Sequence, residues 1–165
     1  MKNSNIMKIL MSKKPCAAAI LRGSCKFPHI YGTVRFYNAG RGNVLTVFDI
    51  NGLPIESNRC AERFFAVHIH EKGTCEGTTD EPFSESGAHY NPHNCPHPMH
   101  VGDLGVLFAD CNGTAQSAMI FESFSIREII GGSVIIHKSP DDFMTQPSGN
   151  SGERIACGII KKCKF

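Results

Sequence analysis

Short apolar runs with a two-residue period recur along this chain of 165 residues. In the run at 30–37, Ile30, Val34 and Phe36 fall on one face while Thr33 and Arg35 fall on the other, which is the pattern of a half-buried strand. Similar runs lie at 16–21, 44–50, 63–70, 106–109, 115–121, 133–137 and 155–160. Because no helical periodicity separates these eight runs, the sequence predicts an all-β fold, either an antiparallel sandwich or a barrel.

Two stretches interrupt this regular spacing. Residues 71–104 and 138–153 are irregular and too long for hairpin turns, so we expect them to be functional loops. Residues 123–130 are expected to form a turn or two of helix. We expect residues 1–15 to be a flexible N-terminal extension and residues 16–165 to be one domain, because a chain of this length can bury its own core.

Charge and hydropathy exclude several classes of partner. A net charge of +2 gives no signal for a polyanion, so we expect no nucleic-acid partner. No apolar run approaches the ~20 residues of a membrane span, so we expect no membrane partner. The N-terminus lacks the apolar segment of a secretory signal, which favours a cytoplasmic location unless a signal has been removed. The eight cysteines leave the compartment open.

Six of the eight histidines lie between positions 68 and 100. His68 and His70 stand two residues apart on a predicted strand, so their side chains leave the same face about 6.5 to 7 Å apart and can converge on one ion. An isolated pair of this kind also occurs by chance on surface strands. Neutral imidazole is the commonest protein ligand for zinc and copper, so the crowding favours a metal site.

A second set of donors follows in one loop. It comprises His89, His97, His100 and Asp103, and three imidazoles with one carboxylate can close a tetrahedral zinc site. His137 ends another apolar run, where a lone histidine is more commonly a strand-end residue than a ligand. The residues by themselves therefore allow one metal ion or two.

Five strings occur in order along the chain: A-V-H-I-H-E-K-G-T-C, S-G-A-H-Y-N-P, H-V-G-D-L-G, I-I-H-K-S-P-D-D and S-G-N-S-G-E-R-I-A-C-G-I-I. With these motifs the chain resembles the copper/zinc superoxide dismutase family over roughly residues 16 to 160. The resemblance implies an eight-stranded antiparallel Greek-key β-barrel with two long functional loops. It also implies an oxidoreductase that dismutates superoxide to hydrogen peroxide and oxygen at a copper ion cycling between +2 and +1, beside a structural zinc ion.

Carried over residue by residue, the resemblance implies two ligand sets that share one ring. Copper would be held by His68, His70, His89 and His137. Zinc would be held by His89, His97, His100 and Asp103. His89 would bridge the two ions as an imidazolate and would carry a proton to the peroxide.

The resemblance also implies roles for residues around the metals. Arg154 matches an arginine of the substrate channel, whose fixed charge would attract and orient superoxide. Asp141 matches a carboxylate that links the copper ligand His68 to the zinc ligand His97. A homodimer and a copper chaperone are partner hypotheses that follow from the same family.

The resemblance implies an intrachain disulfide between Cys75 and Cys157. The states of the other six cysteines stay open: Cys16, Cys25, Cys60, Cys95, Cys111 and Cys163. Cys16 and Cys163 belong to first and last strands that are neighbours in this fold, so their pairing is a hypothesis.

The chain departs from the family pattern mainly in its loops. The zinc loop, which runs from His89 to Asp103, is shorter than is common in the family, and His93 and Cys95 are competing donors within it. We prefer His97 over His93 as the zinc ligand, because its step of eight from His89 fits the family. The 138–153 loop lacks most of the charges that steer superoxide, and Ala66 replaces a glycine. No ligand is lost, although a metal-binding or copper-delivery domain without turnover and a zinc-stabilised binding module remain alternatives.

Overall fold

The computed structural model describes residues 6–56, 58 and 62–164, and every expected run within it forms a strand. The strands are β1 Ala17–Gly23, β2 Tyr31–Gly40, β3 Asn43–Asn51, β4 Phe64–His70, β5 Asp103–Phe108, β6 Ala115–Phe121, β7 Ser133–His137 and β8 Arg154–Lys162. The expected helical turn is present as α2 (Ile126–Ile129), preceded by a 2.6 Å hydrogen bond from the Ser125 N–H to Glu128 Oε2. Several boundaries differ by one to three residues, and the shift that matters most is at β5, which begins at Asp103 and so places an expected zinc ligand on a strand.

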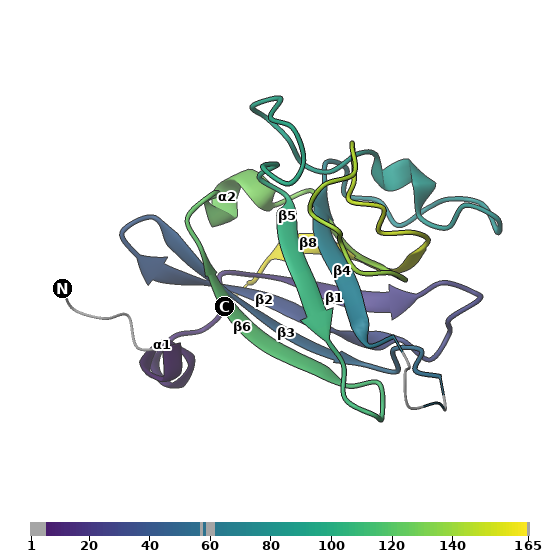
Figure 1. Cartoon of the computed structure of the whole chain (residues 1–165). Helices are drawn as coiled ribbons and strands as arrows, with labels where there is room; N and C mark the ends of the chain where they lie inside the picture. Colours follow the sequence, from purple (N-terminus) through teal and green to yellow (C-terminus); the bar gives the residue numbers. More distant parts are fainter. Residues whose placement is uncertain (1–5, 57, 59–61, 165) are drawn as a thin grey trace.

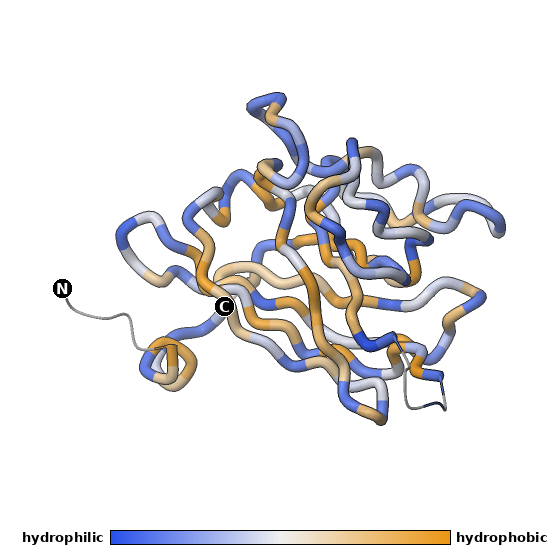
Figure 2. Tube along the Cα trace, in the orientation of Figure 1, coloured by the Kyte–Doolittle hydropathy of each residue, from blue (hydrophilic) through white to orange (hydrophobic). Residues whose placement is uncertain are grey.

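The strands pair antiparallel in the order β5-β4-β7-β8-β1-β2-β3-β6 and curl into a nearly closed barrel (Figure 1). β4 pairs with β7 and β8 pairs with β1, so strands distant in sequence become neighbours, as in a Greek key. Phe36, Phe48 and Phe65 are buried in the interior. Figure 2 shows the hydrophobic residues along the strands and hydrophilic residues gathered in the loops. The expected fold class is confirmed.

The expected N-terminal extension includes a helix, α1 (Ile6–Ser12). Ile9 of this helix is only 6% exposed and packs against Tyr37 of β2 and Leu45 of β3. The segment therefore contacts the outer face of the sheet, while its flexibility and the domain boundary at residue 15 stay predictions. Across the described ranges, no helix has the length and apolar character needed to cross a membrane.

The two long loops lie at one end of the barrel (Figure 1). The first joins β4 to β5, and the second, 138–153, joins β7 to β8. The expected disulfide is present and links Cys75 in the first loop to Cys157 in β8, with Cα atoms 5.7 Å apart. Ala66 is buried in β4, where its N–H donates a 3.0 Å hydrogen bond to Ser139 O, so the strand accommodates the alanine methyl group.

The remaining cysteines carry no disulfide where the structure describes them. Cys16, Cys25, Cys95, Cys111 and Cys163 are free thiols. Cys60 lies outside the described residues.

Candidate metal centre

Four histidines meet where β4 and β7 lie side by side. His68 and His70 are on β4, and its hydrogen-bonded neighbour β7 ends at His137. His89, from the first long loop, forms an isolated β-bridge with His70. All four side chains are buried, and one potential ligand atom of each lies within 4.8 Å of the others. We call these four residues the first donor group; His137 joins it because the barrel brings β7 beside β4.

A second donor group adjoins the first. It consists of His89, His97, His100 and Asp103, whose potential ligand atoms also lie within 4.8 Å of one another. His89 therefore belongs to both groups. Among the described residues, His93 and Cys95 belong to neither group, and His93 is exposed. The structure thus brings His97 to the centre rather than its competitor His93.

In the first donor group, each strand histidine uses one ring nitrogen for a hydrogen bond. His70 Nδ1 donates to Gly87 O at 2.9 Å, His137 Nδ1 donates to Gly152 O at 3.2 Å, and His68 Nε2 donates to Asp141 Oδ2 at 2.7 Å. Four buried nitrogens of the group have no hydrogen-bond partner among the described residues: His68 Nδ1, His70 Nε2, His89 Nε2 and His137 Nε2. Because unpaired buried polar atoms are costly, four in one place fit a bound metal ion.

In the second donor group, three imidazoles converge on one carboxylate. Asp103 Oδ1 lies 2.8 Å from His89 Nδ1 and 3.4 Å from His100 Nδ1, while its Oδ2 lies 3.0 Å from His97 Nδ1. Burial acts to raise the pKa of Asp103, but the hydrogen bond with His89 and the other contacts outweigh it and lower the pKa. An ionised carboxylate with three imidazole nitrogens is a donor set that suits zinc.

Burial keeps the strand histidines neutral. It lowers the pKa of His70 to about 2 and that of His137 to about 3, and neighbouring histidines act in the same direction. Burial also lowers the pKa of His68, against the opposing hydrogen bond to Asp141. Since only the neutral imidazole offers a lone pair, these rings are in their metal-binding form at neutral pH.

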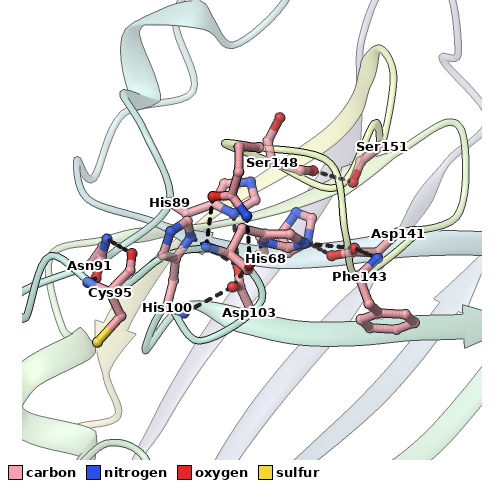
Figure 3. A network of polar contacts seen from close by, with 12 residues as sticks. His68, His89, Asn91, Cys95, His100, Asp103, Asp141, Phe143, Ser148 and Ser151 are labelled. Atoms are coloured by element: carbon pink, nitrogen blue, oxygen red, sulfur yellow. Dashed lines mark hydrogen bonds and ion pairs between the residues drawn. The ribbon is translucent and has the colours of Figure 1, made fainter.

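Asp141 connects the two donor groups (Figure 3). Its Oδ2 accepts the bond from His68, its Oδ1 accepts a 2.8 Å bond from His97 Nε2, and the Phe143 N–H adds a 2.7 Å bond. Burial acts to raise the pKa of Asp141, but these hydrogen bonds outweigh it and lower the pKa to about 2. Gly149 packs so closely here, with φ of +67°, that a Cβ would overlap the carboxylate.

Two side-chain amides hold the backbone of the loop between His89 and Asp103, which carries the second donor group. Gln146 Oε1 accepts the His97 N–H at 3.0 Å, and its Nε2 donates to His97 O at 2.6 Å. Asn91 binds the backbone of Cys95 in the same way, at 3.0 and 2.9 Å. These contacts replace the ladder hydrogen bonds that a loop lacks. Neither contact was predicted; for Gln146, no local pattern links it to a residue 49 positions away.

Arg154 lines a surface hollow that also reaches histidines of both donor groups. Its guanidinium donates to Phe83 O at 2.8 Å, Gly87 O at 2.9 Å and Ser86 Oγ at 3.0 Å. Ser86 was not singled out in the sequence. Burial lowers the pKa of Arg154, with Glu81 opposing it, yet arginine stays protonated in proteins. The side chain is therefore a positive charge fixed in direction by the first loop.

The lining of this hollow carries few charges. Arg154 is its one lysine or arginine among the described residues, and Glu71 is its one carboxylate. The 138–153 loop contributes only the uncharged residues Pro147, Ser148, Ser151 and Gly152. This agrees with the expected scarcity of steering charges.

The Greek-key barrel and the adjoining donor groups define a class, a β-barrel protein with a binuclear metal centre. The family model described as Copper/zinc superoxide dismutase (SODC) matches residues 30–160. The chain is similar to the copper-zinc superoxide dismutase 2 of Aquifex aeolicus, with 31% identity over 132 residues that cover 72% of each chain. It is also similar to the extracellular copper-zinc superoxide dismutase of Mus musculus, with 34% identity over 143 residues that cover 81% of this chain and 54% of that protein.

A solved structure agrees with the sequence matches. The crystal structure of the clock protein EA4 superposes with a TM-score of 0.73 at 30% identity, covering 92% of this chain and 97% of that chain. The chain therefore belongs to the copper/zinc superoxide dismutase family. The family expected from the sequence motifs is confirmed, and with it the enzyme class and the two metals, copper and zinc.

Proposed function

We propose that this chain dismutates superoxide to hydrogen peroxide and oxygen, with copper in the first donor group and zinc in the second. The observation that carries this proposal is the shared ring of His89, whose Nδ1 lies beside Asp103 and whose Nε2 is buried without a partner among the described residues. A ring bound by cations at both nitrogens is an imidazolate, a form that two adjacent positive ions favour. His89 would thus couple the two sites.

The chemistry of each donor set supports the assignment of its metal. The first group offers four imidazole nitrogens, which suit copper, and the second adds the Asp103 carboxylate, which suits tetrahedral zinc. Bound copper would supply the one-electron redox chemistry that zinc lacks. Asp141 would position His68 and His97 without touching substrate.

Dismutation consumes protons, and His89 is suited to deliver one. While Nδ1 stays beside Asp103, Nε2 can accept a proton and pass it to the peroxide without the ring leaving its place. Because His89 lines the hollow, the proton would be delivered where the product forms.

Arg154 would bind and orient the superoxide anion. Its guanidinium is anchored by four acceptors of the first loop and lines the same hollow as His70, His89 and His137. A fixed cation of this kind attracts a small anion and holds it beside the first donor group.

Metal content measured together with the dismutation rate tests the function. We expect catalysis from chain loaded with copper and zinc and none from chain loaded with zinc alone, since zinc cannot change oxidation state. A chain that holds one copper and one zinc but does not dismutate superoxide would favour a copper-delivery or metal-binding domain instead.

The homodimer, the copper chaperone and the cytoplasmic location stay predictions. The Mus musculus relative is named an extracellular enzyme, and disulfides such as Cys75–Cys157 are commonest in proteins of oxidising compartments. Sedimentation measures the oligomeric state, copper transfer from a chaperone tests that partner, and fractionation of the source cells tests the location.

A further inference from the structure

Two free cysteines face each other where the ladder of β1 and β8 runs out. Within the ladder, Ala17 pairs with Lys162 and Ala18 pairs with Lys161. One step further in the same register, Cys16 stands opposite Cys163, and the Cys163 N–H donates a 3.0 Å hydrogen bond to Cys16 O. The two residues are therefore cross-strand neighbours, although 147 positions separate them in sequence (163 minus 16).

Both thiols lie on the outer face of the barrel. Ala17 and Ile160 are buried, whereas Lys161 is exposed, so residues that alternate with the inward set point outward. Cys16 and Cys163 belong to this outward set, and directly opposed residues have Cβ atoms about 4.5 to 5.5 Å apart. A disulfide needs about 3.5 to 4.5 Å, so a small movement at these two strand ends is enough to join them.

We propose that Cys16 and Cys163 are a redox-sensitive pair that hydrogen peroxide converts into a second disulfide. The Cys16 thiolate attacks one oxygen of the peroxide, the O–O bond breaks, and sulfenic acid and water form once a proton is taken up. The Cys163 thiol then attacks that sulfur, releasing a second water as the S–S bond forms. The two thiols lose two electrons in total, and the peroxide gains them.

Exposure decides the order of these steps. Cys16 is exposed, whereas Cys163 is half-buried, and burial raises the pKa of the Cys163 thiol with Cys16 acting in the same direction. Since thiolate is the reactive form, Cys16 is the thiol that peroxide reaches first and Cys163 is the one that resolves the sulfenic acid.

The new bridge cannot arise by exchange with the existing disulfide. Cys157 pairs with Arg22 near the other end of the same ladder, six residues before Cys163 and thus about 20 Å away along the strand. An oxidant is therefore required, and hydrogen peroxide is the product of the proposed function. The bridge would tie the start of β1 to the end of β8, where the Cys163 N–H already donates to Cys16 O.

Peroxide treatment of the metal-loaded protein tests the pair, after mild reduction that leaves Cys75–Cys157 intact. We expect two fewer thiols open to alkylation, a mass loss of two hydrogen atoms, and a cross-linked peptide that contains Cys16 and Cys163. The oxidised chain should unfold at a temperature on the order of 5 °C higher than the reduced chain.

Three variants sharpen this experiment. Cys16→Ser and Cys163→Ser should abolish the cross-linked peptide and the thermal shift. Cys111→Ser removes an exposed thiol elsewhere and should behave as the unmodified chain does. The proposal would be overturned if Cys16 and Cys163 both remain open to alkylation after peroxide treatment. It would also be overturned if Cys16 is oxidised to sulfinic acid without forming a cross-link. Because peroxide is added, a chain that fails to dismutate superoxide would leave this result unaffected.

Discussion

The two donor groups share His89 but are held in place by different means. Three residues of the first group lie on β4 and β7, where ladder hydrogen bonds fix their register. In the second group only Asp103 lies on a strand, and His97 depends on Asp141 and Gln146 from the 138–153 loop. Strand register therefore positions three of the four residues of the first group, whereas the second group depends mainly on loop segments and on side chains of the 138–153 loop. Changes in that loop should damage the zinc side first.

The largest effect is expected from His89→Ala, since this ring belongs to both groups. Both metal affinities should fall, and dismutation should fall by about 100-fold or more because its proton donor is also lost. Metal titration and rate measurements check this. The control is His93→Ala, at an exposed histidine of the same loop, which should leave the metal affinities and the dismutation rate unchanged. If His89→Ala binds copper and zinc as tightly as the unmodified chain does, a shared ring is excluded.

The next largest effect is expected from Asp141→Asn, which should weaken zinc binding more than copper binding. The amide keeps the size of the side chain but loses the charge and one of the two acceptors that His68 and His97 use. Zinc affinity should fall by about 10- to 100-fold, the range typical for partners of metal-bound histidines. Copper affinity should fall less, because β4 still holds His68. Competition with a chelator measures both; a greater loss of copper than of zinc would reverse the comparison.

Acid should destabilise the metal-free protein mainly through the first group. The folded pKa values of His70 and His137, about 2 and 3, lie below the ordinary 6.5, so the unfolded chain takes up protons first as the pH falls. The free energy of unfolding should thus decrease as the pH drops below 6.5 toward about 2, and Asp141 adds to the loss between its ordinary 3.8 and about 2. Urea unfolding at several pH values checks this, and higher stability in acid would contradict it.

Gln146→Ala should weaken the zinc side alone. Two hydrogen bonds to the His97 backbone disappear, each worth about 1 kcal/mol net, so zinc affinity should fall by up to roughly 30-fold while copper affinity stays unchanged. Gln116→Ala is the matched control, because that amide contacts Asp49 on the barrel surface. If zinc affinity changes equally in the two variants, Gln146 has no specific role in holding His97.

Ionic strength should have the smallest effect. Among the described residues, the lining of the hollow contains one arginine and one carboxylate, so its net charge is small. Salt therefore has little attraction between the hollow and superoxide to screen. We expect the dismutation rate to fall by less than about threefold between low and physiological salt. Stopped-flow rates across a salt series check this, with Arg154→Ala showing how much of the dependence that side chain supplies. A steep decrease in the unmodified chain would point to charges outside the hollow.

Several features could be predicted from the sequence alone. The two-residue period located the strands, and the order of the histidine motifs indicated the family. Other features depended on contacts between distant segments. Sequence left His93 and His97 as competitors, and the structure buries His97 between Asp141 and Gln146 while His93 stays exposed. The contact of Ile9 with the sheet was likewise not predicted, because it requires the outer face of β2 and β3.

The sequence by itself determined which donor atoms are available and which runs become strands, because donor chemistry belongs to each residue and periodicity is set by near neighbours. The tertiary structure decided how those donors divide. His137 became part of the first group only because β7 pairs with β4, and Cys16 met Cys163 only because β1 pairs with β8. Such pairings follow from closing the whole barrel, and no local segment contains them.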